Sequence, residues 1–309
     1  MAKLSESVLE ELWFGEDDPA TADAKAAKSL AAHLAELEGL RPFPVVVQKV
    51  IACVSRPDFR MDQVRDLIEE DPALAARILR VANSVAFQTR LPCASIQDAI
   101  IRMGARAVTD LAAGMAAMTA FADVKGAGKV VREHCVGTAA IVRALAYRGS
   151  DGVIPAIAFL AGLLHDIGKL LLMQTRHQTY AQLVGSAVGT TDELHLRERE
   201  FLGYDHAVLG GHVLAKWGLP SPLPKVVAWH HQPTRANKAG GSVAVLVACL
   251  RVADVIDTLV SSDKPTDGAT AKRLADGSDA VHAGLGEGDI AATLAEAPKL
   301  RGEALMLFR

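Results

Sequence analysis

A histidine and an aspartate stand side by side inside an apolar run of the sequence, the segment "GLLHDIGKLLL" at residues 162–172. Burying two titratable groups among leucines is costly unless a partner satisfies them. His165 and Asp166 are also side chains of the types that bind divalent cations in proteins. Lys169 lies one helical turn after His165, where an ammonium group could hold a phosphate or relay a proton. The segment therefore predicts either a metal site with phosphate chemistry or a hydrogen-bonded pair in the core.

Further histidines and aspartates recur along the chain at intervals that place them on separate helices. His134 lies in an apolar helix, where the alternative to a ligand is a packed core histidine. His230 and His231 end a helix before Pro233, where two histidines could instead cap the helix C-terminus. The residues predicted to bind metal are His134, His165, Asp166, His206, His230, His231 and Asp254. Such a set can hold two divalent ions, and paired ions activate water for attack on a phosphoester.

The segment "YDHAVLGGHVLAKWGLP" carries a predicted ligand at the start of a helix. Asp205 is expected to cap this helix, with His206 in its first turn. Since the positive end of a helix dipole disfavours imidazolium, a neutral His206 that is free to ligate is predicted. Gly210 and Gly211 predict close approach of a neighbouring helix, and His212 is interpreted as structural.

A very apolar helix at residues 243–260 supplies the last two carboxylates of interest. Asp254 follows an alanine and a valine and is predicted to face the interior. Asp257 lies three residues later, and the sequence allows it either to share that side or to face water.

The elements that must position these side chains are all predicted to be helices. Apolar residues spaced three and four apart recur along almost the whole chain, which indicates an all-α protein. The helices are expected at 1–35, from a proline-marked start at 40–47 to Cys53, and at 72–82, 96–103, 105–121, 130–148, 154–175, 191–201, 206–217, 222–231, 243–260 and in a terminal segment after 288.

Two of these helices have well-marked ends. Asp71 suits the N-cap and Pro72 the first turn of one helix. In "SIQDAIIRMG", Ser95 is expected to cap the next helix, Asp98 to complete a capping box and Gly104 to stop it.

A glycine-rich polar stretch at residues 123–131 is predicted to be a hinge between helical subdomains. It is not a phosphate-binding loop, because Val130 follows Lys129 and the first glycine of that motif is out of register. A second polar stretch, at 261–288, is expected to be a loop, a hinge or a partner surface. The predicted parts are a helical extension at 1–37, a first helical half at 38–125, a second half with an HD-like bundle at 126–260 and a C-terminal helical segment at 261–309.

The composition restricts the class of protein. A chain of 309 residues with 50% hydrophobic content can build a large core in one or two domains. The net charge of −3 does not favour nucleic acid. Four scattered cysteines, an acidic start unlike a signal peptide and apolar runs interrupted by charge predict a cytoplasmic protein with reduced thiols and no membrane span.

The order of the donors resembles the HD-domain metal-dependent phosphohydrolase superfamily, in which a histidine, an HD pair and a distant aspartate bind metal. His134, the pair in "LLHDIGK" and Asp254 occupy those places. The remaining histidines, together with Lys169, resemble the extended ligand set of the HD-GYP cyclic di-GMP phosphodiesterases. The Gly-Tyr-Pro motif of that group is missing, and Gln232–Pro233 follow the histidine pair in place of an acidic residue.

The closer resemblance is to the HDOD family, over residues 38 to 260. It is carried by "GLRPFPVVVQKV", "LIEEDPALAARILRVANSVAF", "SIQDAIIRMG", "FLAGLLHDIGKL", "YDHAVLGGHVLAKWGLP" and "AWHHQP". The resemblance implies a bacterial signalling module: an HD-like helical bundle preceded by a helical N-terminal subdomain. It also implies regulatory work in cyclic di-GMP networks, motility, chemotaxis or stress responses.

Three functions follow from these observations. The favoured one is a non-catalytic regulator that binds signalling proteins or senses a nucleotide or phosphate. The alternative is a phosphohydrolase or phosphodiesterase that uses one or two iron, manganese or zinc ions, with Lys169 orienting the phosphate. A DNA-binding role for "AIIRMGARAVTDLAAG" is disfavoured because the chain is acidic and lacks a basic recognition face.

Overall fold

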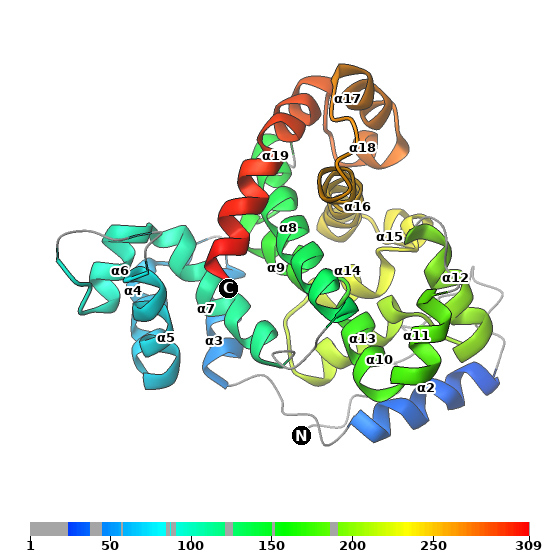
Figure 1. The fold of residues 1–309 in the computed structure, drawn as a ribbon, viewed down its shortest axis with the longest axis horizontal. Coiled ribbons are helices and arrows are strands. Elements are labelled where there is room, and N and C mark those ends of the chain that lie inside the picture. The colour runs from blue at the N-terminus through cyan, green and yellow to red at the C-terminus, as the bar shows by residue number, and fades with distance from the viewer. Residues whose placement is uncertain are drawn as a thin grey trace.

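The computed structural model describes residues 24–37, 45–56, 58–84, 87, 91–120, 126–149, 152–185 and 191–308. All regular elements in these ranges are helices, which confirms the predicted all-α class (Figure 1). They are α2 (Ala24–Glu36), α3 (Val45–Val54), α4 (Met61–Glu69), α5 (Pro72–Ala82), α6 (Ile96–Met103), α7 (Ala105–Ala120), α8 (Ala127–Arg148), α9 (Pro155–Leu164), α10 (Ile167–Thr175), α11 (His177–Gly185), α12 (Thr191–Leu202), α13 (His206–Lys216), α14 (Leu223–Trp229), α15 (Pro233–Ala239), α16 (Gly241–Ser261), α17 (Gly268–Ala275), α18 (Ser278–His282) and α19 (Glu287–Leu307).

Helices α3 to α7 pack on one another and form the part of the molecule on the left of Figure 1. Each turns one apolar face inward, and Ile51, Ile68 and Ile78 are fully buried there. Helix α7 also packs against α9, which joins this group to the rest of the protein.

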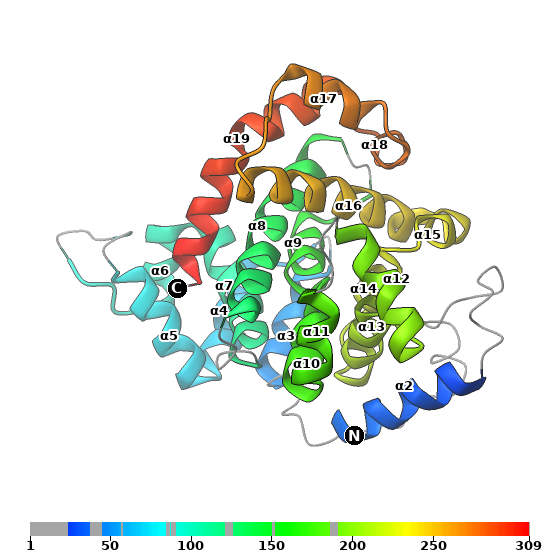
Figure 2. The same ribbon diagram turned by 45° about the vertical axis from the view of Figure 1, so that its right-hand side comes forward.

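Helix α8 lies at the centre of the second half, where it packs against α9, α16 and α19. Figure 2 shows α16 crossing α8 and α9. On the other side, α13 packs against both α10 and α14. This arrangement surrounds the segment that carries His165 and Asp166 with helices that carry the other predicted ligands.

The predicted helix caps are confirmed. The Asp71 side chain accepts hydrogen bonds from the backbone N–H groups of Ala73 and Leu74. Ser95 and Asp98 form a capping box at the start of α6. These caps satisfy backbone donors that have no partner within the helix.

The helix predicted at 154–175 is wrong in one respect, because the structure divides it into α9 and α10. Asp166 leaves the helical conformation, with φ −99° and ψ 15°, so His165 and Asp166 occupy the turn between the two helices. A continuous helix would point adjacent side chains about 100° apart. The turn instead directs both side chains toward the same cluster of donors.

Residues 155–175 together have the length and composition of a membrane span, and an 18-residue window within them has a mean hydropathy of 1.7. In the structure 89% of this window is buried inside the protein, as in the core helices of a globular domain. The apolar character of the segment is therefore explained by its central position in the bundle.

Glycines allow the helices around this turn to approach closely, as predicted for Gly210 and Gly211. A Cβ at Gly210 would lie 2.9 Å from the Ile167 side chain, and one at Gly211 would lie 2.7 Å from the carbonyl oxygen of Pro224. A Cβ at Gly168 would lie only 1.9 Å from the carbonyl oxygen of His206. Helices α10 and α13 therefore cross with their backbones in contact.

Other expectations differ from the structure in their details. Helix α8 begins at Ala127 after Gly126, whose φ is +62°, so the predicted hinge is helical from residue 127 onward. The polar stretch at 261–288 contains two short helices, α17 and α18. Asp267 caps α17 by accepting a hydrogen bond from the backbone N–H of Thr270. Helices α4 and α11 were not predicted. The expectations for residues 1–23 and 123–125 lie outside the described residues.

Helix α2 is fastened to the second half of the chain by a buried histidine. His33 is fully buried, with its Nδ1 2.6 Å from the Tyr204 hydroxyl and its Nε2 2.7 Å from the Thr175 hydroxyl. Glu36 also forms an ion pair with Arg176. Burial, followed by the nearby Arg176 charge, lowers the pKa of His33 to about 4.

We expect His33→Gln to reduce the pH dependence of stability between about pH 4 and pH 6.5. In this window the unfolded chain protonates His33 and the folded chain does not, so stability falls as the pH decreases. The slope of unfolding free energy against pH should decrease by up to about 1.4 kcal/mol per pH unit. Urea titrations of both proteins across this range measure it. Equal slopes would contradict a neutral, buried His33.

Candidate metal centre

The structure brings all seven predicted ligands together around the turn between α9 and α10. They come from α8, this turn, the start of α13, the end of α14 and α16. Two groups of three donors result, and within each group the ligand atoms lie within 4.8 Å of one another. The first group is His134, His165 and Asp254, and the second is His206, His230 and His231.

Asp166 lies between the two groups. Its Oδ1 is 3.1 Å from His206 Nε2 and 3.9 Å from His230 Nε2, in the second group. Its Oδ2 is 3.5 Å from His165 Nε2, in the first group. One carboxylate thus faces both groups, which is the position of a ligand that bridges two ions.

Lys169 lies on the first turn of α10 and points back at this carboxylate. Its Nζ is 2.6 Å from Asp166 Oδ2, and both side chains are buried. Burial opposes the charge on Lys169, but the adjacent Asp166 outweighs burial and raises the lysine pKa. Lys169 is therefore a charged group inside the cluster, one that could also meet an incoming phosphate.

Most of the imidazoles are held by the nitrogen that faces away from the cluster. Nδ1 of His165 lies 2.7 Å from the carbonyl oxygen of Gly162, and Nδ1 of His230 lies 2.7 Å from that of Val227. A carbonyl accepts only, so each Nδ1 must carry the proton. Their Nε2 atoms then present a lone pair to the cluster, which is the usual arrangement of metal-binding histidines.

Several polar atoms that face the cluster are buried without a hydrogen-bond partner. These atoms are Nε2 of His165, Nε2 of His230 and Oδ1 of Asp166. A buried polar atom left unsatisfied costs about 1–3 kcal/mol. A divalent cation in each group would satisfy such atoms, so the residues present fit a metal site by their chemistry as well as by their position.

The protonation of the cluster follows from its carboxylates. Burial lowers the pKa of His134, but hydrogen bonds to Asp254 and Asp257 outweigh it and raise the pKa to about 10. Burial also lowers the pKa values of His165 and His230, which have no carboxylate hydrogen bond and stay neutral. The first group thus contains one imidazolium and one neutral imidazole.

The prediction of a neutral His206 is wrong for the structure as it stands. Asp205 caps α13 and His206 opens the helix as expected, with the helix dipole disfavouring a positive charge. However, Nδ1 of His206 is 2.6 Å from Glu198 Oε2, and that carboxylate is fully buried. Burial lowers the pKa of His206, but Glu198 outweighs it and raises the pKa to about 9. Binding a cation at Nε2 would therefore release a proton.

His212 lies outside both groups, as predicted. It is buried on α13 with its Nδ1 2.8 Å from the carbonyl oxygen of Val208. This is the hydrogen bond of a structural histidine within its own helix.

Comparison with known proteins agrees with this arrangement of helices. The HDOD domain family matches residues 40–233, well over half of the chain. The chain belongs to the HDOD family. The matched range contains Lys169 and every predicted ligand except Asp254.

Solved structures of bacterial proteins share this fold. The "Putative phosphohydrolase" of Shewanella amazonensis SB2B is 27% identical with a TM-score of 0.66, covering 89% of this chain and 98% of that one. An HDOD domain protein of unknown function from Geobacter sulfurreducens is 22% identical with a TM-score of 0.73, covering 92% of this chain and 98% of that one.

A relative is also found by sequence. A Treponema pallidum (strain Nichols) protein called an uncharacterized protein is 23% identical over 203 residues. That match covers 65% of this chain and only 40% of the relative's length.

Sequence reasoning missed the residues that hold two of the candidate ligands, His206 and His231, in place. Glu198 on α12 accepts from both the backbone N–H and Nδ1 of His206, and Tyr180 donates to it. His195, one turn earlier, stacks on His231 with ring centroids 4.3 Å apart. Glu198 lies in a polar helix, and its sequence neighbours gave no sign that it is buried, because its partners lie on other helices.

The second aspartate of α16 resolves an alternative that the sequence left open. Asp257 is fully buried, with Oδ2 2.8 Å from Nδ1 of His134 and Oδ1 3.1 Å from Nε of Arg301. Gly137 on α8 makes room for it, since a Cβ there would lie 1.8 Å from Asp257 Oδ1. Arg301 lies on α19, beyond the range matched by the HDOD family. The C-terminal helix therefore contributes to the site.

Proposed function

We propose that this HDOD protein is a bacterial signalling regulator that keeps the HD site as a binding site for one or two divalent metal ions. In this proposal the protein acts by binding signalling partners or by sensing a nucleotide or phosphate, and its output does not require turnover. Iron, manganese and zinc suit a set of imidazole and carboxylate donors.

The observation that carries the metal proposal is the set of buried, unpartnered donor atoms on both sides of Asp166. His134, His165 and Asp254 would hold one ion, and His206, His230 and His231 the other, with Asp166 shared. The hydrogen bonds at Nδ1 orient the rings before any ion arrives, which supports binding by a preformed site.

The burial of the site favours a regulatory role. His165, Asp166, His206 and His230 are all buried, while the side chains of His134 and Asp254 retain 17% and 19% of their exposure. Lys169 also occupies one oxygen of Asp166, the carboxylate that would have to bridge the two ions. A site this buried leaves little room for a large substrate to reach Lys169.

A metal-dependent phosphohydrolase is the second candidate, and one observation favours it. Two donor groups on either side of one carboxylate are the arrangement used by two-metal hydrolases. Bound ions in such a site polarise the phosphoryl group and supply a hydroxide nucleophile. Here Lys169, beside Asp166, would orient the phosphate.

Metal analysis combined with a turnover assay tests the proposal. Protein purified without chelators, then loaded separately with iron, manganese or zinc, is expected to retain one or two ions per chain. It is expected not to hydrolyse phosphomonoesters or cyclic dinucleotides. Protein that takes up no metal while folded would contradict the metal site. Turnover that requires Lys169 would favour the phosphohydrolase.

The regulatory part of the proposal has its own test. On the family resemblance, we expect its signalling partners in the cytoplasm, in networks of cyclic di-GMP, motility or stress responses. Affinity capture from the native organism should recover one specific protein, and His165→Ala should not abolish that complex. Failure to recover a partner with either protein would argue against regulation by protein binding.

We expect Arg301→Gln to weaken metal binding at the first group by about 10- to 100-fold, because Arg301 holds Asp257, and Asp257 orients His134. Arg148→Gln is the matched control, because it breaks a different ion pair of α19, that between Arg148 on α8 and Glu296 on α19. The side chains of Arg301 and Arg148 are similarly exposed, at 21% and 23%. Competition with a fluorescent zinc chelator measures both affinities. Equal affinities in the two variants would show that Arg301 does not position His134.

A further inference from the structure

A second cavity lies away from the metal centre, where the first half of the chain meets α8, α9 and α19. Its volume is about 430 Å³, within the range of small-molecule pockets. Arg143, on its wall, lies nine residues after His134 on α8, or roughly 14 Å along the helix axis. The cavity is therefore separate from the donor groups described above.

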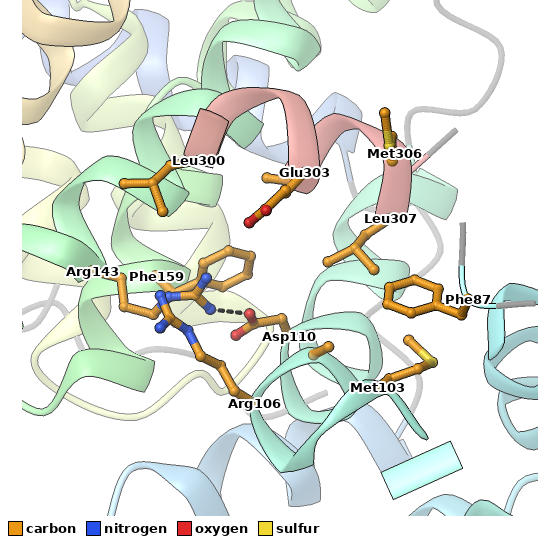
Figure 3. Close-up of a pocket in the computed structure, with 12 residues that line it drawn as sticks. Phe87, Met103, Arg106, Asp110, Arg143, Phe159, Leu300, Glu303, Met306 and Leu307 are labelled. Atoms are coloured by element: carbon orange, nitrogen blue, oxygen red, sulfur yellow. Dashed lines mark hydrogen bonds and ion pairs between the residues drawn. The ribbon is translucent and has the colours of Figure 1, made fainter. Parts of the chain in front are cut away.

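The cavity has a polar end and an apolar end. Figure 3 shows the guanidinium groups of Arg106 and Arg143 beside each other, with Asp110 next to them. Phe87, Met103 and Leu307 line the opposite side. A ligand that fits both ends must carry a charged group and an apolar body.

The polar end contains more positive than negative charge. Asp110 is almost fully buried and forms an ion pair with Arg143, whose side chain is 90% buried. Nε of Arg143 is buried and has no hydrogen-bond acceptor. Arg106 lies over the ring of Tyr147, 5.3 Å from its centroid, and contributes a second guanidinium. The two guanidiniums and the Asp110 carboxylate together carry one net positive charge, and one buried N–H donor of Arg143 has no partner.

We propose that this cavity binds an amphiphilic carboxylate, with its carboxylate between Arg106 and Arg143 and its apolar body against Met103, Phe87 and Leu307. Guanidinium groups match the planar geometry of a carboxylate and can bond both of its oxygens. A single negative charge balances the polar end. A phosphate monoester carries up to two negative charges, and the exposed Glu303, which also lines the cavity, would repel a dianion more strongly than a monoanion.

Calorimetric titration of the full chain with octanoate tests this assignment. Octanoate is expected to bind once per chain. It should bind more tightly than 1-octanol, which carries no charge, and more tightly than octyl phosphate, which carries more negative charge than the site balances. Arg106→Gln should weaken octanoate binding by about tenfold or more, because it removes a charge-assisted contact. Arg273→Gln, at an exposed arginine on α17, is the control and should leave the affinity unchanged.

Arg106 is the residue to replace because it is exposed, whereas replacing Arg143 would leave Asp110 buried without a counter-charge. The ligand is located independently by methyl NMR of the methionines. Octanoate should shift the Met103 resonance and leave that of Met173, on α10, in place.

Three results would overturn the assignment: equal affinity for octanoate and 1-octanol, an affinity that Arg106→Gln does not change, or a Met103 resonance that does not move. Tighter binding of octyl phosphate than of octanoate would overturn the choice of a carboxylate. Zinc affinity should be the same in Arg106→Gln and the unmodified protein, so failure here is distinguishable from failure of the metal site.

Discussion

Replacing Gly168 with alanine is expected to destabilise the protein by about 3 kcal/mol or more, the upper part of the range for overpacked cores. The new Cβ would lie 1.9 Å from the carbonyl oxygen of His206 and 2.9 Å from its Cα. These are backbone atoms of α13, which cannot rotate away as a side chain can. Helices α10 and α13 would have to separate, and the turn that carries His165 and Asp166 would move away from His206.

The control for this substitution is Gly302→Ala in α19. No heavy atom lies within 4 Å of a Cβ at Gly302, and the residue is inside a helix. Alanine there should stabilise the protein by roughly 0.5–1 kcal/mol, since glycine is the poorer helix former. Urea unfolding of both variants measures the contrast. A Gly168→Ala protein as stable as Gly302→Ala would mean that α10 and α13 do not cross as described.

Asp166→Asn is expected to weaken metal binding by about 100-fold or more and, without metal, to destabilise the fold by about 3–5 kcal/mol. The loss of affinity follows because Asp166 faces both donor groups. The loss of stability follows because Lys169 is buried and Asp166 is its ion-pair partner, so the substitution leaves an uncompensated charge.

The double variant Asp166→Asn with Lys169→Met separates the two effects. Removing both charges should restore most of the stability, because no uncompensated charge then stays buried. It should not restore metal binding. Urea unfolding in the presence of a chelator and metal analysis of the loaded proteins provide the two measurements. A double variant that binds metal normally would show that Asp166 is not a ligand.

The helix ends were predictable because they depend on neighbours in the sequence. Asp71, Ser95 and Asp205 each cap a helix through a backbone N–H two or three residues away. The break at Asp166 was not predictable in this way, since the apolar pattern continues through it and the departure from helix is tied to packing against α13.

The candidate ligands were predictable as residue types, whereas their partners were not. A histidine or aspartate among leucines is conspicuous, and the order of these residues along the chain resembles the HD superfamily. Glu198 and Arg301 lie among other charged residues, so nothing local distinguishes them. Their roles arise only when α12 and α19 pack against the helices that carry His206 and Asp257.

The sequence by itself determined the all-α class, the capped helix starts, the HDOD family and the seven candidate donors, His165 and Asp166 among them. Only the tertiary structure decided which carboxylate faces which imidazole, and with it the protonated state of His206. It also brought Arg106 to the same cavity wall as the buried ion pair of Arg143 and Asp110. The physical reason is the range of the interactions: a cap or an apolar stripe is complete within one helix. The charge of a buried group depends on whatever other helices bring within a few ångströms of it.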